Sequence, residues 1–176
     1  MHNLFLGTAK HMMKNVWLPN KILKQADLKA IQELIDSMKV PSSMGRIPNK
    51  FASNFGSFTS EQWKLWTVVY SEFAPKKFLP SEDYRLWLLF VKACRILTAP
   101  VVTIQSLAVA HSSIMQFCKK FEYRYGQLEV TPNMHLHSHL VNLFWIMYIT
   151  FDCFLLNVLM SFWETSRQIK EQWRCS

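Results

Sequence analysis

Residues 80–126 read PSEDYRLWLLFVKACRILTAPVVTIQSLAVAHSSIMQFCKKFEYRYG, and this stretch decides the fold. Apolar side chains recur in it every three or four residues, the spacing that places them on one face of an α-helix. Pro80 and Pro100 bound the first such segment, and Gly126 ends the second. The apolar face of the first helix contains Leu86, Leu89, Phe90, Ala93 and Leu97, and that of the second contains Leu107, Ala110, Ile114, Phe117, Phe121 and Tyr125. The stretch therefore predicts two consecutive amphipathic helices.

Glu82 and Asp83 fall in the first turn of the earlier helix, where the helix dipole favours negative charge. Adjacent residues on a helix project in different directions, so these two carboxylates make a poor acid–base pair. We interpret them as a helix start.

The rest of the chain also predicts helices separated by proline loops. We expect a helix from Leu4 to Trp17, and a second that is capped by Asp27 and ends before Pro41. Residues 41–58 read as a loop. Thr59 and Gln62 have the spacing of a capping box, and the buried stripe that follows would be Trp63, Trp66, Tyr70 and Phe73. The run at 101–104 is the one short β-like segment, so the predicted fold class is mostly α.

The composition describes a globular, basic chain with one hydrophobic core. It has 176 residues, 50% hydrophobic and 14% aromatic, and 20 Lys+Arg against 12 Asp+Glu, a net charge of +8. Such an excess favours polyanions, either nucleic acid or anionic lipid. Cysteines 94, 118, 153 and 175 are widely spaced and contain no CxxC pair, so neither a zinc ribbon nor a disulfide scaffold is indicated. The apolar run at the N-terminus is too short for a secretory signal, so we do not expect secretion.

Residues 140–163 read LVNLFWIMYITFDCFLLNVLMSFW, which is about the length that crosses a bilayer. Asp152 lies near the centre and costs roughly 3 kcal/mol there, which the Leu, Ile and Phe residues can offset. Hydropathy thus makes this apolar segment a candidate for a single transmembrane helix.

Some polar residues are candidates for binding. Lys119, Lys120 and Arg124 come late in the second helix, and Arg46 and Lys50 lie in the loop at 41–58. These five cations could contact DNA phosphates, although solvated helix ends explain the first three equally well. The alternating His135, His137 and His139 lack a nearby Cys, so hydrogen-bonded histidines at a helix start after Pro132 are preferred to a metal site. No nucleotide-binding or hydrolase motif is present, and no small-molecule substrate is evident.

Three blocks of the chain resemble a family of transposases. MHNLFLGTAKH at residues 1–11, SFTSEQWKLWTVVYS at 57–71 and TPNMHLHSHL at 131–140 are similar to segments of CACTA-type (EnSpm-like) DNA transposases, and they occur in the order of that family. In the family the first block follows the second catalytic aspartate. Three ordered blocks are much more specific than any one of them.

The resemblance implies an RNase H-like transposase whose three carboxylates bind two Mg²⁺ or Mn²⁺ ions for DNA cleavage. Residues 1–140 would correspond mainly to the helical insertion between the second Asp and the final Glu. Met1 would stand two positions after that second Asp. His2 matches the histidine of the Asp-x-x-His pattern, and it cannot assemble a metal site alone. We therefore expect no cofactor in this piece.

The family's third carboxylate should follow the third block, in a segment similar to Asp-Tyr-Gly-Pro-x-Tyr-x-Phe-Trp-x-Phe-Ser-Phe-Glu-Arg-x-Asn. This chain does not contain that segment. However, Trp145-Ile146-Met147, back-translated as TGG ATT ATG and read from its third base, gives Asp-Tyr. The same frame through residues 154–160, written TTT CTT TTG AAC GTT TTA ATG, gives Ser-Phe-Glu-Arg-Phe-Asn. We infer a frameshift between Leu140 and Trp145, which makes 141–176 an accidental, apolar tail.

Three hypotheses follow. The first is a degenerate transposase fragment, not an enzyme, which keeps weak DNA affinity and would be nuclear. The second is a small membrane protein with a basic helical domain and a span at about 140–163. The third is a DNA-binding module recruited from the transposon.

Overall fold

The computed structural model describes residues 3–39, 51–137 and 139, which all belong to a unit that covers Met1–His139. Helices connected by turns make up this part of the chain, and it contains no strand. The predicted fold class, mostly α, is confirmed.

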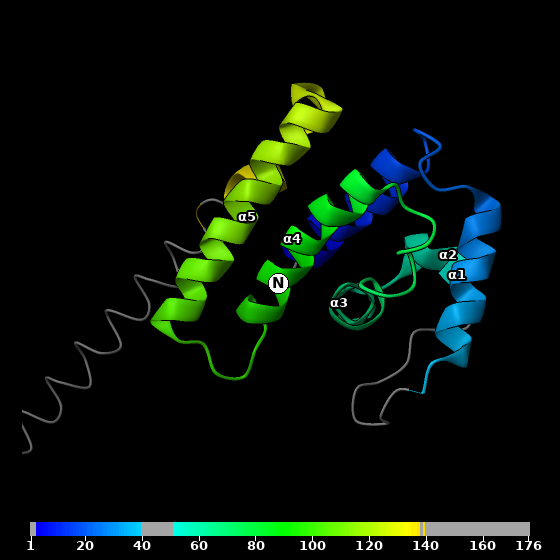
Figure 1. The fold of residues 1–176 in the computed structure, drawn as a ribbon, viewed down its shortest axis with the longest axis horizontal. Helices are drawn as coiled ribbons and strands as arrows, with labels where there is room; N and C mark the ends of the chain where they lie inside the picture. The colour runs from blue at the N-terminus through cyan, green and yellow to red at the C-terminus, as the bar shows by residue number, and fades with distance from the viewer. Residues whose placement is uncertain (1–2, 40–50, 138, 140–176) are drawn as a thin grey trace, which may run out of the picture. The chain divides into compact units, whose positions relative to one another are not determined.

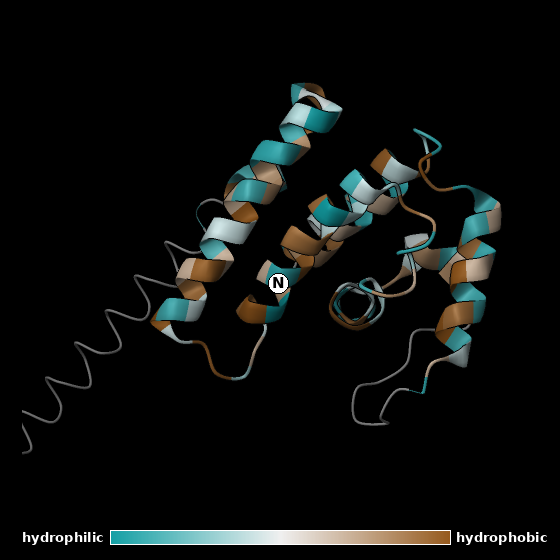
Figure 2. Ribbon diagram, viewed as in Figure 1, coloured by the Kyte–Doolittle hydropathy of each residue, from teal (hydrophilic) through white to brown (hydrophobic). Residues whose placement is uncertain are grey.

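Two long helices, α4 (Ser81–Leu97) and α5 (Ile104–Tyr125), form a helical hairpin (Figure 1). Hydrophobic and hydrophilic positions alternate along both helices as the periodicity predicts (Figure 2). The predicted apolar faces are buried except at Leu89 and Tyr125, which are half-buried, and Trp87 is buried in addition. A ring pair joins the two helices, since the centroids of Phe90 and Phe117 lie 5.1 Å apart.

The connection between α4 and α5 is a turn, and helix α5 begins inside the β-like run at 101–104. The Thr103 hydroxyl accepts a hydrogen bond from the backbone N–H of Ser106 at 3.2 Å. The Ser106 hydroxyl accepts one from the N–H of Thr103 at 2.9 Å. This reciprocal cap satisfies two backbone donors at the helix start. Gly126 ends α5 with φ of 91°, a conformation that glycine adopts readily.

The predicted helix at Leu4–Trp17 is present, but most of it is π-helical. Elements η1 (Asn3–Ala9) and η2 (Met12–Trp17) make up the segment, and its hydrogen bonds include one from the N–H of Leu18 to the carbonyl of Met13, five residues back, at 3.3 Å. Phe5, Met12 and Trp17 are buried. The wider helix changes the rotation per residue, which an ideal period of 3.6 cannot anticipate.

Helix α1 (Gln25–Ser37) starts two residues before the predicted cap. Asp27 lies at the third helical position, where its carboxylate accepts a hydrogen bond from the backbone N–H of Lys24 at 2.8 Å. The carboxylate thus satisfies a backbone donor from inside the first turn. The assignment of Asp27 as the N-cap was wrong by three residues, because Lys24 is the N-cap and Asp27 is its capping-box partner.

The predicted loop at 41–58 is partly wrong, because α2 (Phe51–Asn54) and the 3₁₀ turn η4 (Phe55–Ser57) lie within it. Phe51 is buried and stacks on Trp66, with ring centroids 4.3 Å apart. Tertiary packing against aromatic rings therefore stabilises a helix too short to be predicted from periodicity.

Helix α3 (Ser60–Leu65) begins at the predicted capping box and continues as the π-helical η5 (Trp66–Tyr70). The N–H of Thr59 donates to Gln62 Oε1 at 2.8 Å, and the N–H of Gln62 donates to Thr59 Oγ1 at 3.3 Å. The predicted stripe is buried as far as Tyr70, but Phe73 is 57% exposed. The helix ends at Tyr70 and turns follow, so Phe73 leaves the buried face.

None of the helices among the described residues has the length and apolarity needed to cross a membrane. The candidate span at about 140–163 and the proposed frameshift lie outside the described residues, as do Arg46 and Lys50.

Candidate functional site

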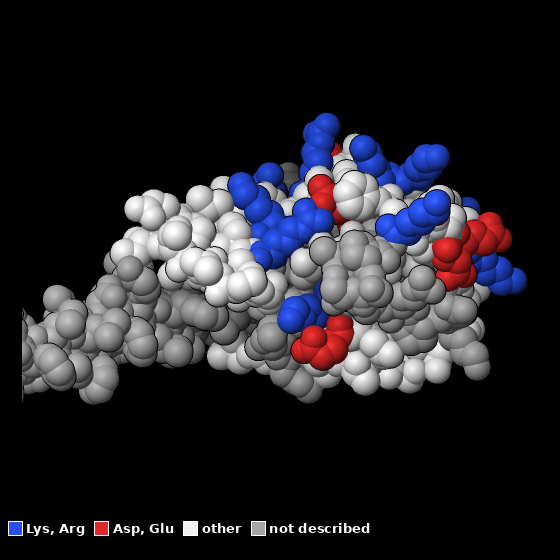
Figure 3. Space-filling view, turned by 90° about the horizontal axis from the view of Figure 1, so that it is seen from below, with Lys and Arg blue, Asp and Glu red and all other residues white. Residues whose placement is uncertain are grey.

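Basic side chains dominate the charged surface of the molecule. On the face that Figure 3 shows, Lys and Arg side chains spread over much of the described surface, with fewer Asp and Glu among them. Some of these cations form ion pairs with carboxylates of the described residues. The cations without such a partner are free to bind an anionic ligand. The α4–α5 hairpin contains both kinds.

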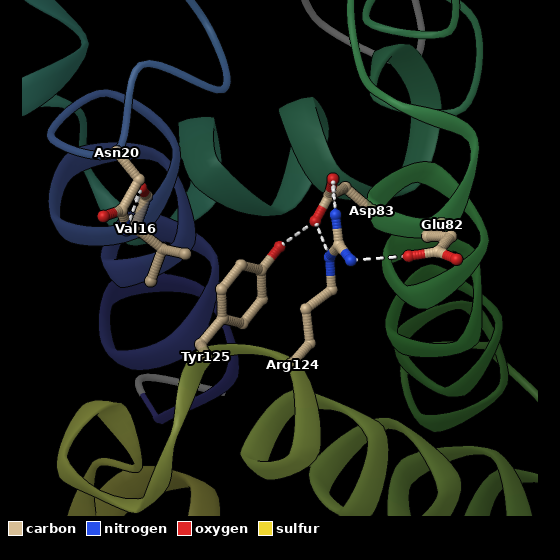
Figure 4. A network of polar contacts seen from close by, with 6 residues as sticks. All are labelled: Val16, Asn20, Glu82, Asp83, Arg124 and Tyr125. Atoms are coloured by element: carbon tan, nitrogen blue, oxygen red, sulfur yellow. Dashed lines mark hydrogen bonds and ion pairs between the residues drawn. The ribbon is translucent and has the colours of Figure 1, made fainter.

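At the end of the hairpin away from its connecting turn, Arg124 of α5 forms ion pairs with two carboxylates of α4 (Figure 4). Its Nε lies 2.5 Å from Asp83 Oδ1, and its Nη2 lies 2.7 Å from Asp83 Oδ2. A third contact joins Nη1 to Glu82 Oε2 at 2.5 Å. Tyr125 also donates its hydroxyl proton to Asp83. This arrangement, the Asp83–Arg124 lock, holds the guanidinium in one orientation.

Asp83 is fully buried, although its place in the first turn predicted a solvated helix start. Burial by itself raises the pKa of this carboxyl, but hydrogen bonds from Arg124 and Tyr125 and the charge of Arg124 outweigh burial and leave the pKa below its usual value. The same carboxylate raises the pKa of Arg124. Asp83 therefore stays ionised and paired, a structural role that the sequence pattern had not indicated.

Beside the lock lies a hollow of about 510 Å³ between α4 and α5, which we call the hairpin hollow. Its lining consists of Glu82, Arg85, Leu86, Lys120, Tyr123 and Arg124. Arg85 and Lys120 are exposed, and neither forms an ion pair with any described residue. Tyr123 is 94% exposed. Two unpaired cations and an open aromatic face thus border one concave surface.

The cations predicted from the sequence differ in their positions and in their ion pairing. Lys120 and Arg124 both line the hairpin hollow, but the guanidinium of Arg124 is already held by the two carboxylates. Lys119 is exposed and lines a different hollow, which includes Cys118 and His135. Arg85 and Tyr123 were missed. Neither stands out in the sequence, because only the packing of α4 against α5 brings them to the same hollow.

The three histidines of the third block have different surroundings. His137 is buried and shares a hydrogen bond of 2.6 Å with Thr8 of η1, 129 residues away. Burial lowers the pKa of His137 to about 4, so its ring is neutral at pH 7. The rings of His135 and His139 are exposed and lie 5.3 Å apart. Within the described ranges, no group of three or more His, Cys, Asp or Glu side chains could hold a metal ion; His2 lies outside them.

The Thr8–His137 bond is part of a wider junction between the first and third blocks. Gly7 lies against Asn133 so closely that a Cβ atom at position 7 would stand 2.6 Å from Asn133 Nδ2. Helix α3, from the second block, also packs on η1. The three blocks singled out in the sequence therefore meet in one part of the fold.

No protein-family model matches the chain, and neither a curated protein nor a solved structure is detectably similar to it. The contacts, burial and charges of the described residues therefore carry the functional inference, together with the resemblance of the three blocks.

Proposed function

We propose that this chain is a DNA-binding helical piece of a CACTA-like transposase, corresponding to the insertion of an RNase H-like catalytic domain, and that it binds DNA without cutting it. The observation that supports binding most strongly is the hairpin hollow, which is lined by the exposed ring of Tyr123 together with the unpaired Arg85 and Lys120. Cations contact phosphates, and an open aromatic ring stacks on an unpaired base. The net charge of +8 favours the same polyanionic ligand.

The Asp83–Arg124 lock fits this function as a support for the site. A guanidinium held by Asp83 and Glu82 fixes the last turn of α5, and Tyr123 and Lys120 belong to that turn and the one before it. A fixed helix turn presents the exposed ring from a rigid backbone, which lowers the entropic cost of binding. Arg124 itself then acts through position rather than as a free phosphate ligand.

Absence of cleavage is the second part of the proposal. The family's Ser-Phe-Glu-Arg segment with the third carboxylate is missing from the reading frame of these 176 residues. Two-metal cleavage needs carboxylates that converge on both ions. Incubation of the purified chain with DNA and Mg²⁺ or Mn²⁺ should leave the DNA intact, and metal-dependent nicks would overturn this part.

Tyr123 gives the sharpest test of binding. We expect Tyr123→Ala to weaken binding to a single-stranded oligonucleotide by about 5- to 150-fold, because stacking on one base contributes roughly 1–3 kcal/mol. Tyr123→Phe keeps the ring and should bind as the unmodified chain does. Fluorescence anisotropy with a labelled oligonucleotide measures both.

Equal affinities of the Ala and Phe variants would contradict a stacking role of Tyr123. Because its side chain is 94% exposed, neither substitution should disturb the fold, and circular dichroism checks this.

The competing function, a small membrane protein, rests on the apolar composition of residues 140–163. Flotation of the full chain with neutral lipid vesicles at high salt would favour it, since electrostatic attraction is then screened.

A further inference from the structure

The junction of the first and third blocks contains another hollow, the junction hollow, which is separate from the hairpin hollow. Its polar lining comes from two segments that are distant in the sequence, residues 10–15 and 131–133. The side chains that line it include Lys10, His11, Lys14, Asn15, Thr131 and Asn133. No carboxylate belongs to this lining, so its formal charge is positive.

The lysines of the junction hollow are available to a ligand. Lys10 and Lys14 are four residues apart, about one helical turn, so their side chains project from the same side. Neither forms an ion pair with a carboxylate of the described part of the chain. Two ammonium groups that line one concave surface repel each other, and a bound anion offsets this electrostatic repulsion.

Neutral donors complete the ligand shell. The Asn15 amide lies 3.1 Å from His11 Nδ1, which positions both side chains at the rim. Asn133 comes from the other segment of the lining, and its side-chain amide can donate a hydrogen bond to an anion. Glu129 is the nearest described carboxylate to His11, with Oε2 3.9 Å from Nε2. Glu129 is absent from the lining, and it forms no ion pair with Lys10 or Lys14.

The two segments that line the junction hollow belong to parts of the chain that contact each other directly. At Gly7 the backbone lies against the Asn133 side chain so closely that a Cβ atom would force this side chain to shift, and Thr8 bonds to the buried His137. Donors on two interlocked segments are preorganised, which lowers the entropic cost of binding. Preorganised ammonium and amide donors around a cavity suit a phosphate group with its several acceptor oxygens.

We propose that the junction hollow is a phosphate-binding site formed by Lys10, Lys14 and Asn133. The phosphate is that of a nucleic-acid backbone or of a free phosphate, and the chemistry that recognises it is the same. If the phosphate belongs to a nucleic-acid backbone, the junction hollow is a second DNA contact, and this assignment rests on the proposed function. The residues that form the junction hollow differ from those of the hairpin hollow.

Inorganic phosphate tests the site alone. In ¹H–¹⁵N NMR spectra of the full chain, added phosphate should shift the backbone amide signals around residues 10–15 and 131–133 in a saturable manner. Lys10→Gln/Lys14→Gln should weaken this binding by at least about tenfold, because charged hydrogen bonds to the anion are lost. The control Lys76→Gln/Lys77→Gln removes the same charge from exposed positions elsewhere and should have no effect.

Asn133→Asp is a nearly isosteric second variant. It replaces an amide donor by a carboxylate that repels phosphate, and its expected effect is also a loss of at least about tenfold. If phosphate shifts no signals at the hollow, or if the control weakens binding as much as the Lys10/Lys14 variant does, the proposal is wrong.

DNA distinguishes the two sources. A loss of DNA affinity in the Lys10/Lys14 variant, beyond that of the control, assigns the phosphate to the nucleic-acid backbone. Unchanged DNA affinity with lost phosphate binding supports a site for free phosphate. The phosphate and DNA affinities of the Lys10/Lys14 variant do not depend on Arg85, Lys120 or Tyr123. A failure of the hairpin hollow to bind DNA therefore shows separately, in the variants of those three residues.

Discussion

Asp83 links the two helices of the hairpin through a partly buried ion pair. Its carboxylate is fully buried, and Arg124 supplies the only cation that pairs with it among the described side chains. Arg124→Met keeps the aliphatic stem and leaves this charge uncompensated, which should lower the free energy of unfolding by about 3–5 kcal/mol. Urea denaturation followed by circular dichroism measures the loss.

Glu82 provides the matched control, since it pairs with the same guanidinium but its side chain is 71% exposed. Glu82→Gln should cost no more than about 1 kcal/mol. Similar losses in the two variants would contradict the assignment of the stabilising pair to the buried carboxylate.

His137 makes stability depend on pH in a defined range. Burial lowers its pKa from 6.5 to about 4 in the folded chain, so the unfolded chain binds a proton first as the pH falls. The neutral ring therefore contributes stability that is complete above pH 6.5 and is lost between 6.5 and about 4. Denaturation midpoints across this range should fall for the unmodified chain and fall less for His137→Gln.

The lowered pKa of Asp83 acts in a different range. Its stabilising effect is complete above the unfolded value of 3.8 and is lost as the pH falls through the lower folded value. A fall in stability confined to pH below 3.8, with none between 6.5 and 4, would contradict the account of His137.

At the scale of the elements, the positions of the longer helices were predictable from the sequence, whereas their π-helical geometry and the short helix α2 were not. Helices α4 and α5 follow a period of 3.6 over many turns, so their apolar positions identify them. The capping box at Thr59 and Gln62 was also readable, because it depends on two residues at a fixed spacing.

The errors have physical reasons. The π-helical stretches change the rotation per residue, and η5 ends at Tyr70, so the stripe that reached Phe73 was wrong at its last position. Helix α2 has four residues and depends on the stacking of Phe51 against Trp66, a contact between distant parts of the chain. Local patterns contain no information on such a contact.

The candidate site was predictable only in part for the same reason. Lys120 and Arg124 were identified from the charge at the end of α5, a local feature. Arg85 and Tyr123 join them only through the pairing of two helices. Likewise, the burial of Asp83 follows from the position of α5, whereas the first turn of α4 alone favours a solvated carboxylate.

At the scale of the whole molecule, the described residues form one helical unit in which cations outnumber carboxylates and two hollows are lined by unpaired lysines or arginines. The hairpin hollow offers an aromatic ring as well, and the junction hollow offers amide donors. The hairpin hollow therefore suits an unpaired base with its phosphate, and the junction hollow suits a phosphate alone.

The salt dependence of DNA binding tests the central claim, that the cations of the hairpin hollow contact DNA phosphates. Plots of log affinity against log salt should be steep for the unmodified chain with a single-stranded oligonucleotide. Arg85→Gln/Lys120→Gln should reduce the slope by roughly 1.4, about 0.7 for each lost phosphate contact. Lys76→Gln/Lys77→Gln, which removes the same charge, should leave the slope unchanged. Equal slopes for both double variants, or affinity that does not change with salt, would contradict the claim.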